Sequence, residues 1–473
     1  MGDAHKGDAG AVIDSVLRRI TPTESERKEI DVMLYRIMKA TEDAVRPLKL
    51  EKTLAGSFLR DTWLADKKEL DIFILFPAHV PREELESTGL SIGKSITKSL
   101  GGAYEIAYAE HPYVRARFGD FLVDFVPCYD IRDPGMIQSS VDRTPHHNRY
   151  ILKSLVKGMS SQVRLLKQFC KGIGVYGSDL RVEGFSGYLC ELLIIRYGTF
   201  RNLLAEAAKW EAGKVFIDLE GHASKGSPGA SARFSSQPLV VIDPVDKNRN
   251  VAAALSPAAF ERFRHSCASF LESPSERYFR ISRAPMDRKR LRSLAEARGT
   301  LLLLVAFKRP AVVDDVLYPQ MRKSVRRLGS ALRGGDFRVL GQDAWCDPKG
   351  CALLLELEVW KLPNIRVIIG PPVFSGGHSR QFIGKYKGKG RLLVEGSDWI
   401  AETSRDFTEA PRALRAFLKG GRAALEGRGI ASYVARGLSS GFAVKEGAAV
   451  LGHAAGNMEF AMFLTNYFKN KIV

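Results

Sequence analysis

Residues 55–77 decide the fold, and they read AGSFLRDTWLADKKELDIFILFP. A Gly56–Ser57 pair follows a short predicted strand. Eleven residues then lead to Glu69 and Asp71, which stand at the start of an apolar run that ends at Phe76. Such an unbroken apolar run is typical of a strand buried on both faces. Side chains alternate along a strand, so both carboxylates lie on one face with their Cα atoms about 6.5 to 7 Å apart.

A third carboxylate has the same kind of surroundings, because Asp124 is the lone acid within FLVDFVP at 121–127. Carboxylates among apolar residues are costly to bury unless a cation balances their charge. Hard oxygen ligands on one face suit Mg²⁺. Three carboxylates on adjacent strands can hold two Mg²⁺ ions for nucleotidyl transfer. We therefore predict that Glu69, Asp71 and Asp124 are catalytic metal ligands.

The Gly56–Ser57 pair and Arg60 predict a triphosphate site beside these carboxylates. Glycine lets backbone amides approach phosphate, Ser57 adds a hydroxyl donor, and Arg60 offers a planar fork to phosphate oxygens. Each feature alone has a structural explanation, since a Gly-Ser pair is commonly a tight turn and two alternating acids commonly mark a surface strand edge. Their combination at this spacing, together with Asp124, favours catalysis.

Composition and charge restrict the class of protein. The chain has 473 residues, and its 71 Lys and Arg exceed its 53 Asp and Glu by 18 charges. With 45% hydrophobic residues it has the composition of a folded globular protein of about three domains. No apolar stretch approaches the roughly 18 residues of a membrane span, and the acids and glycines at the start do not resemble a signal peptide. We therefore predict a cytoplasmic protein without a membrane partner.

The six cysteines show no CxxC spacing. They are predicted to be reduced core residues, and neither a zinc site nor a disulfide framework is expected. They are Cys128, Cys170, Cys190, Cys267, Cys346 and Cys351.

Basic residues gather in three runs of the C-terminal half, at 280–292, 322–327 and 373–394. The last run contains five Lys or Arg and no acid, and its segment GKYKGKGR at 384–391 is predicted to form a loop or ribbon against a phosphate backbone. A solvated face explains each run alone equally well, whereas three runs together favour a nucleic-acid partner. The residues predicted to contact RNA are Arg288, Lys289, Arg290, Lys385, Lys387 and Lys389.

The order of predicted elements indicates a multidomain α+β fold. An N-terminal domain at 1–150 begins with an amphipathic helical pattern over 12–48 and continues with strands. A mostly helical domain follows at 151–275. The remainder, 276–473, contains a strand, a helix and two further strands between 301 and 359, which is half of a ferredoxin-like unit.

Six motifs in this order resemble the DNA polymerase β-type nucleotidyltransferase superfamily and, within it, the archaeal, class I CCA-adding enzymes, which are tRNA nucleotidyltransferases. They are GSFLRDTWL at 56–64, ELDIFILF at 69–76, VDFVP at 123–127, DRTPHHNRY at 142–150, VRLLKQFCKGIGVYG at 163–177 and EGFSGYLCELLI at 183–194. The resemblance implies a polymerase β-type nucleotidyltransferase head, a helical neck, and a basic RNA-binding body and tail.

The resemblance also implies roles for individual residues. It makes the three carboxylates named above the magnesium ligands, and Ser57 and Arg60 the triphosphate contacts. His147, Lys167 and Tyr176 match positions that contact the incoming ATP or CTP in this family, and the adjacent His146 is the alternative to His147.

The implied reaction adds CMP, CMP and then AMP to the 3′ end of tRNA without a nucleic-acid template, and it releases pyrophosphate at each step. The implied partners are tRNA, ATP, CTP and two Mg²⁺ ions, and the oligomeric state is left open, with a homodimer as one option. One alternative is another enzyme of the superfamily, either a poly(A) polymerase or an enzyme that adds only CC or only A. The motifs between 142 and 194 favour CCA addition. A catalytically silent RNA-binding relative is the second alternative, and the presence of all three acids argues against it.

Overall fold

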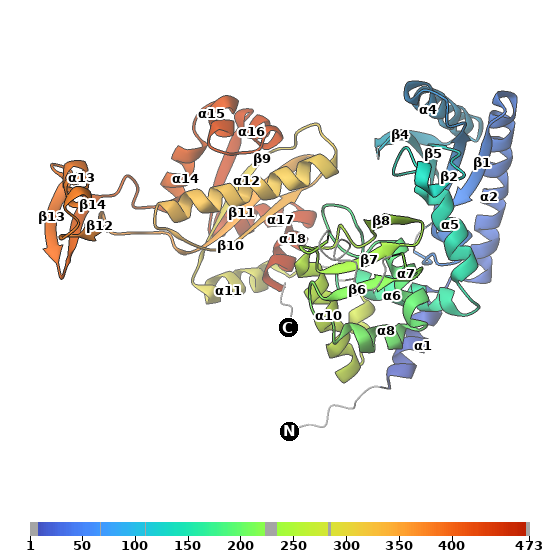
Figure 1. Cartoon of the computed structure of the whole chain (residues 1–473), viewed down its shortest axis with the longest axis horizontal. Helices are drawn as coiled ribbons and strands as arrows, with labels where there is room; N and C mark the ends of the chain where they lie inside the picture. The colour runs from blue at the N-terminus through green and yellow to red at the C-terminus, as the bar shows by residue number, and fades with distance from the viewer. Residues whose placement is uncertain (1–7, 67, 109, 223–233, 282–284, 470–473) are drawn as a thin grey trace. The chain divides into compact units, whose positions relative to one another are not determined.

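The computed structural model describes residues 8–66, 68–108, 110–222, 234–281 and 285–469 (Figure 1). Contacts divide these residues into two compact units, the first ending at residue 281 and the second beginning at residue 285. The separation of the first unit into a head at 1–150 and a neck at 151–275 stays a prediction. No helix of the described ranges is both long and apolar enough to cross a membrane.

A five-stranded sheet organises the first half of unit one. Its strand order is β1-β2-β5-β4-β3, and the pair β2–β5 is parallel while the other neighbours are antiparallel. The strands are β1 (Glu51–Ala55), β2 (Glu69–Phe76), β3 (Ala103–Tyr108), β4 (Pro112–Phe118) and β5 (Phe121–Tyr129). The predicted strand that ends at Phe76 and the predicted strand that carries Asp124 are thus confirmed.

Helix α4 (Arg82–Ser99) covers one face of this sheet at close range. Two of its glycines make this possible. A Cβ at Gly89 would lie 2.6 Å from Pro127 Cβ, and one at Gly93 would lie 2.8 Å from Val114 Cβ. The helix therefore packs directly against the strand that carries Asp124, which fixes that strand in the sheet.

The predicted helical pattern over 12–48 forms two helices instead of one, α1 (Ala9–Ile20) and α2 (Glu24–Val45), followed by a 3₁₀ turn at Arg46–Leu48. The break has a local cause, because Thr23 and Glu26 form a reciprocal capping box that starts α2. The apolar side of α1 joins the hydrophobic core formed mainly by residues 151–279.

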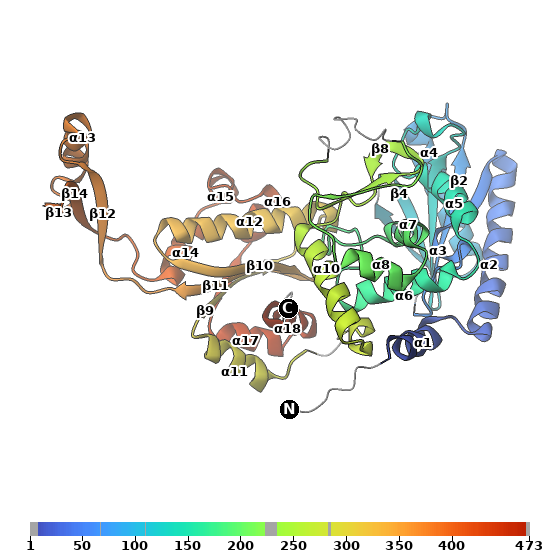
Figure 2. The same ribbon diagram turned by 60° about the horizontal axis from the view of Figure 1, so that its bottom comes forward.

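Helices dominate the second half of unit one, as predicted. They are α5 (Arg143–Ser154), α6 (Met159–Gly172), α7 (Gly187–Tyr197), α8 (Phe200–Ala207) and α10 (Pro257–Glu272), with 3₁₀ turns at Pro134–Met136 and Glu276–Phe279. Ser186 caps α7 by accepting a hydrogen bond from the Leu189 amide. A small sheet in the order β6-β7-β8 was not predicted (Figure 1), and Figure 2 shows its edge strand β8 from another side. Its strands are β6 (Val215–Asp218), β7 (Leu239–Asp243) and β8 (Asp246–Asn250).

The second unit contains a complete ferredoxin-like sheet, which confirms and extends the predicted half. The strand order is β10-β11-β9-β15, with antiparallel neighbours throughout. The strands are β9 (Leu301–Lys308), β10 (Arg338–Cys346), β11 (Gly350–Val359) and β15 (Phe442–Glu446). The helices are α11 (Arg288–Arg298), α12 (Asp314–Gly334), α14 (Ala410–Leu418), α15 (Arg422–Gly427), α16 (Ser432–Ser439), α17 (Ala448–Ala455) and α18 (Met458–Lys469).

Between β11 and α14 the chain forms a three-stranded sheet in the order β12-β14-β13 with one helix (Figure 1). These elements are β12 (Ile365–Pro372), α13 (Gly376–Tyr386), β13 (Gly390–Glu395) and β14 (Asp398–Ser404). The prediction of a loop or ribbon over 384–391 is therefore wrong for 384–386, which end α13, whereas the turn at 387–389 and the start of β13 agree with it. Phe382 and Tyr386 share one face of this helix, and Phe382 packs closely on Gly370 of β12, so tertiary packing outweighs the low helix propensity of its glycines.

The prediction that all six cysteines are reduced is also wrong for one pair. Cys346 and Cys351 face each other across the hairpin formed by β10 and β11 and are joined in a disulfide. The tight turn at 347–350 sets this register. The other four cysteines are buried free thiols.

Candidate active site

Gly56 starts the short helix α3 (Gly56–Leu59), immediately after β1 ends at Ala55. Its φ angle is +79°, which favours glycine, and a Cβ at this position would overlap Asp71 Oδ2. The glycine therefore allows the backbone to pass directly beside a carboxylate. Ser57 follows it in the first turn of α3, as the motif predicted.

Asp71 and Asp124 lie directly opposite each other on the parallel strands β2 and β5. Glu69 stands two residues before Asp71 on β2 and is exposed. Burial raises the pKa of Asp71 to about 6, and the neighbouring charges of Asp124 and Glu69 act in the same direction. The structure thus brings the three predicted carboxylates into one region of excess negative charge.

Arg115 on β4 partly balances this charge. Its guanidinium donates to both carboxylate oxygens of Asp124, at 2.8 and 2.7 Å, and to the Tyr113 hydroxyl at 3.0 Å. A fork of this kind fixes the orientation of the carboxylate. The sequence analysis missed Arg115, although its position in the alternating stretch PYVRARF could have indicated a charge on the same face.

A buried ionic cluster lies around Glu191 of α7. The Glu191 carboxylate is fully buried and accepts hydrogen bonds from Thr62 Oγ1 at 2.5 Å, Arg60 Nε at 3.1 Å and Lys167 Nζ at 3.4 Å. Lys167 Nζ also donates to the Thr62 carbonyl at 3.1 Å, and Arg60 bonds Asn148. Two predicted nucleotide contacts, Arg60 and Lys167, therefore share one buried partner.

Opposing effects act on the pKa values of this cluster. Burial pushes the pKa of Glu191 up, but Lys167, Arg60 and Thr62 outweigh it and hold the pKa below its ordinary value. Burial lowers the pKa of Lys167 by more than the charge of Glu191 raises it. The sequence analysis missed Glu191, whose signal is a lone acid among the apolar residues of YLCELLII.

Tyr176 lies next to Lys167, because both approach Gly187 at the start of α7. A Cβ at Gly187 would lie 3.2 Å from the Tyr176 hydroxyl and 3.7 Å from Lys167 Nζ. Burial raises the pKa of Tyr176 well above its usual range, so the hydroxyl stays protonated. The structure therefore brings these two predicted residues together.

The two adjacent histidines have different surroundings. His146 is buried, and its Nε2 lies 2.8 Å from the Ile131 carbonyl. His147 stacks on Tyr188, with ring centroids 4.0 Å apart, and its Nε2 lies 2.9 Å from Asp243 Oδ2. His146 thus bonds the backbone, whereas His147 belongs to a polar cluster.

Asp243 at the end of β7 is the centre of that cluster and is fully buried. Besides His147 it accepts hydrogen bonds from Arg249 Nη1 at 2.6 Å and from the Tyr188 hydroxyl at 3.2 Å. Burial favours the neutral acid, but the bonds from His147 and Arg249 outweigh it and lower the pKa of Asp243 to about 2. Asp243, Tyr188 and Arg249 were missed, and no local pattern marks them.

Comparison with known proteins gives the family. The model described as "Nucleotidyltransferase domain" matches residues 34–147, "tRNA nucleotidyltransferase, second domain" matches 161–280, and "CCA-adding enzyme, C-terminal domain" matches 298–447. The CCA-adding enzyme of Methanothermobacter thermautotrophicus is 38% identical over 90% of this chain and 92% of its own length. That of Halobacterium salinarum is 40% identical over 91% of this chain and 93% of its own length. The chain belongs to the family of archaeal CCA-adding enzymes.

Membership of the CCA-adding family confirms the predicted superfamily and the predicted class of enzyme, a nucleotidyltransferase. It also favours the predicted reaction over poly(A) addition and over a silent relative. Among solved structures, a Cid1 poly(U) polymerase aligns with 59% of this chain and 100% of its own at 14% identity, and the TM-score of 0.47 is too low to support an argument.

Nucleotidyltransferases of this kind generally use divalent metal ions. In the ranges that the structure describes, no three His, Cys, Asp or Glu side chains converge closely enough to hold a metal ion. Arg115 holds the Asp124 carboxylate, and the like charges around Asp71 oppose closer approach. The donor set nevertheless fits a hard cation, because Asp71 is raised in pKa first by burial and then by the charges of Asp124 and Glu69, and a cation would balance those carboxylates.

The basic residues predicted to contact RNA lie on the surface of the second unit. Arg288, Lys289 and Arg290 form the first turn of α11, which Asp287 caps, and all three are exposed. Arg288 and Lys289 line a cavity of about 490 Å³ together with Trp360. Lys385 near the end of α13, and Lys387 and Lys389 in the turn before β13, are exposed as well.

Proposed function

We propose that this chain adds and repairs the 3′-terminal CCA of tRNA in the cytoplasm, using CTP and ATP without a nucleic-acid template. The observation that carries the proposal is the pairing of Asp71 with Asp124 beside the bare backbone of Gly56. The names of the archaeal relatives give the product of the reaction. At each step the 3′ oxygen of the RNA bonds the α-phosphorus, that hydroxyl loses its proton, and pyrophosphate leaves.

Glu69, Asp71 and Asp124 are the residues that would hold two Mg²⁺ ions. Bound there, Mg²⁺ supplies a lower pKa for the attacking hydroxyl and neutralises charge on the leaving pyrophosphate. Arg115 orients Asp124 and limits the repulsion between the carboxylates before substrate arrives. The excess negative charge at Asp71 supports this assignment.

Ser57 and Arg60 are proposed to contact the triphosphate. Gly56 leaves the backbone amides at the start of α3 accessible, and Ser57 adds its hydroxyl beside them. Arg60 gives one N–H to Glu191 and another to Asn148, out of the five that a guanidinium carries, so donors remain for phosphate oxygens.

His147, Lys167 and Tyr176 are proposed to contact the rest of the nucleotide. Lys167 and Tyr176 meet at Gly187, and His147 is held by Asp243 and Tyr188. The polar surroundings of His147 favour it over His146, whose Nε2 already bonds a backbone carbonyl. Glu191 is then a positioning residue, because it fixes Arg60 and Lys167 without itself facing solvent.

The exposed basic residues of the second unit are proposed to bind tRNA phosphates. The net charge of +18 supports a polyanionic partner. The residues concerned are Arg288, Lys289, Arg290, Lys385, Lys387 and Lys389. A homodimer remains an untested prediction.

The test is transfer from labelled CTP and ATP onto tRNA that lacks its CCA, followed by sequencing of the product ends, with and without EDTA. The proposal expects CCA ends that disappear with EDTA and return when Mg²⁺ is added in excess. Long A tracts would instead identify a poly(A) polymerase, and ends that stop at CC or accept only A would identify a partial CCA enzyme.

A further inference from the structure

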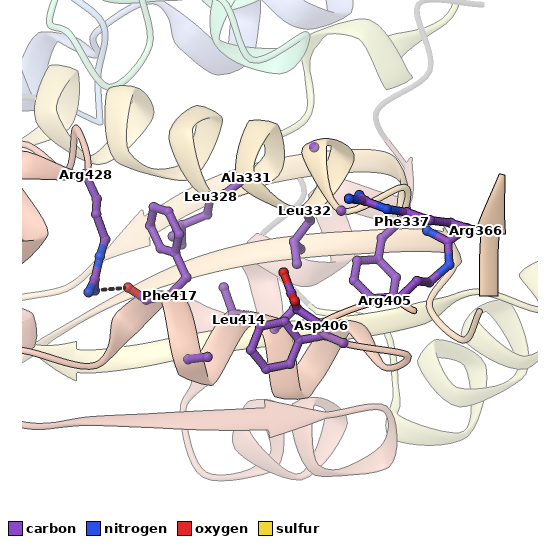
Figure 3. A pocket seen from close by; sticks show the side chains of 15 residues that line it. Leu328, Ala331, Leu332, Phe337, Arg366, Arg405, Asp406, Leu414, Phe417 and Arg428 are labelled. Carbon is purple, nitrogen blue, oxygen red and sulfur yellow. Dashed lines mark hydrogen bonds between the residues drawn. The ribbon is translucent and has the colours of Figure 1, made fainter. Parts of the chain in front are cut away.

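A cavity of about 350 Å³ lies within the second unit (Figure 3). The C-terminal half of α12, the helix α14 and the chain segments around Arg366 and Arg405 line it. A volume of this size falls at the lower end of the range for small-ligand pockets. None of the proposed metal or nucleotide contacts belongs to this unit, so the cavity is separate from them in the fold.

The middle of the cavity is apolar. Leu332 of α12, Leu414 of α14 and Phe337 line it, and all three side chains are buried. Phe417, also on α14, adds a second ring to the wall. Such a surface suits a flat apolar group such as a nucleobase, which loses little by leaving water and gains contact with aromatic faces.

Guanidinium groups stand at both ends of the apolar middle, with Arg428 at one end and Arg366 and Arg405 at the other (Figure 3). Arg428 is engaged by the Phe417 and Lys419 carbonyls. Arg405 pairs with Asp336, yet its Nε is buried and has no hydrogen-bond partner within the described ranges. Buried charged donors of this kind are costly to leave unpaired, and an oxyanion would satisfy Nε.

Arg366 has further capacity at the same end. Within the described ranges its side chain makes one hydrogen bond, from Nε to Thr403 Oγ1 at 3.3 Å, so most of its donors are available. Asp406 also lines the cavity and pairs with no cation among the residues described. Its carboxylate opposes a second anion there and accepts hydrogen bonds from amino groups.

We infer that this cavity binds a nucleoside phosphate, with the phosphate at Arg366 and Arg405 and the base over Leu332 and Leu414. Asp406 favours bases that carry an exocyclic amino group, which adenine, cytosine and guanine have and uracil lacks. Inorganic phosphate alone would leave the apolar middle unused, and an acidic peptide would bring carboxylates against Asp406. The inference goes beyond the proposed function, since it requires no transfer activity. The nucleotide comes either from solution or from an unstacked position of bound RNA.

Two variants of the full chain test the site without touching the proposed catalytic residues. Ala331→Phe fills the cavity from α12 and leaves every charge in place, whereas Arg366→Ala removes one phosphate donor. The matched control is Arg412→Ala, on the outer side of α14, where Arg412 pairs with Glu409 at 3.2 Å and is largely exposed. Circular dichroism melting establishes that each variant folds, and Arg366→Ala serves alone if the larger side chain disrupts folding.

The first arm titrates AMP, UMP and inorganic phosphate into each protein by calorimetry. The second measures the affinity for tRNA without added nucleotide. If the ligand comes from solution, both cavity variants should bind AMP about tenfold more weakly than wild type, and the control should bind it as wild type does. Wild type should bind UMP more weakly than AMP. If the nucleotide belongs to bound RNA, both cavity variants should bind tRNA about tenfold more weakly than wild type, and the control should bind it as wild type does.

The inference is overturned if neither arm distinguishes the cavity variants from wild type. It is equally overturned if Arg412→Ala loses as much affinity as Arg366→Ala, because net charge alone would then explain the effect. Both arms measure binding only. Loss of CCA addition in the transfer assay would therefore contradict the proposed function and leave this result unchanged.

Discussion

Replacing Glu191 by Ala should strongly destabilise the first unit. The carboxylate is fully buried and accepts hydrogen bonds from Thr62, Arg60 and Lys167. Its removal leaves the buried Arg60 and Lys167 cations without their shared anion. Breaking a buried ion pair from one side typically costs about 3 to 5 kcal/mol, and the presence of two cations puts the expected loss at the upper end.

The assay is urea denaturation followed by fluorescence, with Glu206→Ala as the matched control. Glu206 is an exposed acid of α8 that pairs with Lys209 at 3.0 Å, and an exposed pair of this type contributes about 0 to 1 kcal/mol. A second variant, Glu191→Leu combined with Lys167→Leu, removes one cation together with the anion and should recover part of the loss. A Glu191→Ala protein less than about 1 kcal/mol below wild type would refute the buried cluster.

Three further outcomes follow from the structure. Gly56→Ala should cut transfer at least tenfold while tRNA affinity stays near wild type, because a Cβ at φ +79° would collide with the neighbouring carboxylate; unchanged transfer would contradict the close approach. The pKa of Asp243 is lowered to about 2, so its ionised form contributes about 2 kcal/mol above pH 4 that is lost as the pH falls toward 2. Asp243→Asn should remove this pH-dependent contribution, so its stability difference from wild type should shrink between pH 5 and pH 2. A difference that stayed constant over this range would contradict the ionised Asp243. Replacing Lys385, Lys387 and Lys389 by Ala should reduce the log–log salt slope of tRNA binding by about 0.7 to 0.9 for each phosphate that these lysines neutralise, whereas identical slopes would remove this segment from the RNA interface.

The arrangement of the carboxylates could be predicted because its signals are local. Gly56–Ser57, Glu69 and Asp71 lie within one strand–helix–strand stretch, and the alternation of a strand fixes which residues share a face. Asp124 could be added because it is a lone acid in an apolar strand. Asp71 and Asp124 lie opposite each other only in the folded sheet, but predicting this required only that β2 and β5 be neighbours.

The buried clusters could not be predicted, since their members are far apart in the sequence. Glu191 meets Arg60 across 131 residues, and Asp243 meets His147 across 96. Glu191 stands out as a lone acid in an apolar helix, but its partners and those of Asp243 have no local pattern that identifies them. The helix α13 was not predicted for a related reason. Packing of Phe382 on β12 decides its conformation, whereas its glycine-rich sequence disfavours a helix.

The disulfide between Cys346 and Cys351 shows the limit of spacing rules. A sequence separation of five matches no familiar cysteine motif, yet the hairpin register places the two residues opposite each other. Both strands had been predicted. Only the pairing register of the two strands was not predicted, because local sequence patterns do not fix it to within one residue.

Steady-state transfer from labelled CTP onto tRNA lacking its CCA tests whether Asp71 and Asp124 form the catalytic centre of this CCA-adding enzyme. The proteins are wild type, Asp71→Asn, Asp124→Asn and the control Asp120→Asn, an exposed acid in the turn between β4 and β5. Wild type and Asp120→Asn should add nucleotides at similar rates, and each of the other two should lose at least 100-fold, about 2.7 kcal/mol of barrier, with tRNA affinity nearly intact. If Asp71→Asn or Asp124→Asn kept more than a tenth of the wild-type rate, these carboxylates would not be the catalytic centre.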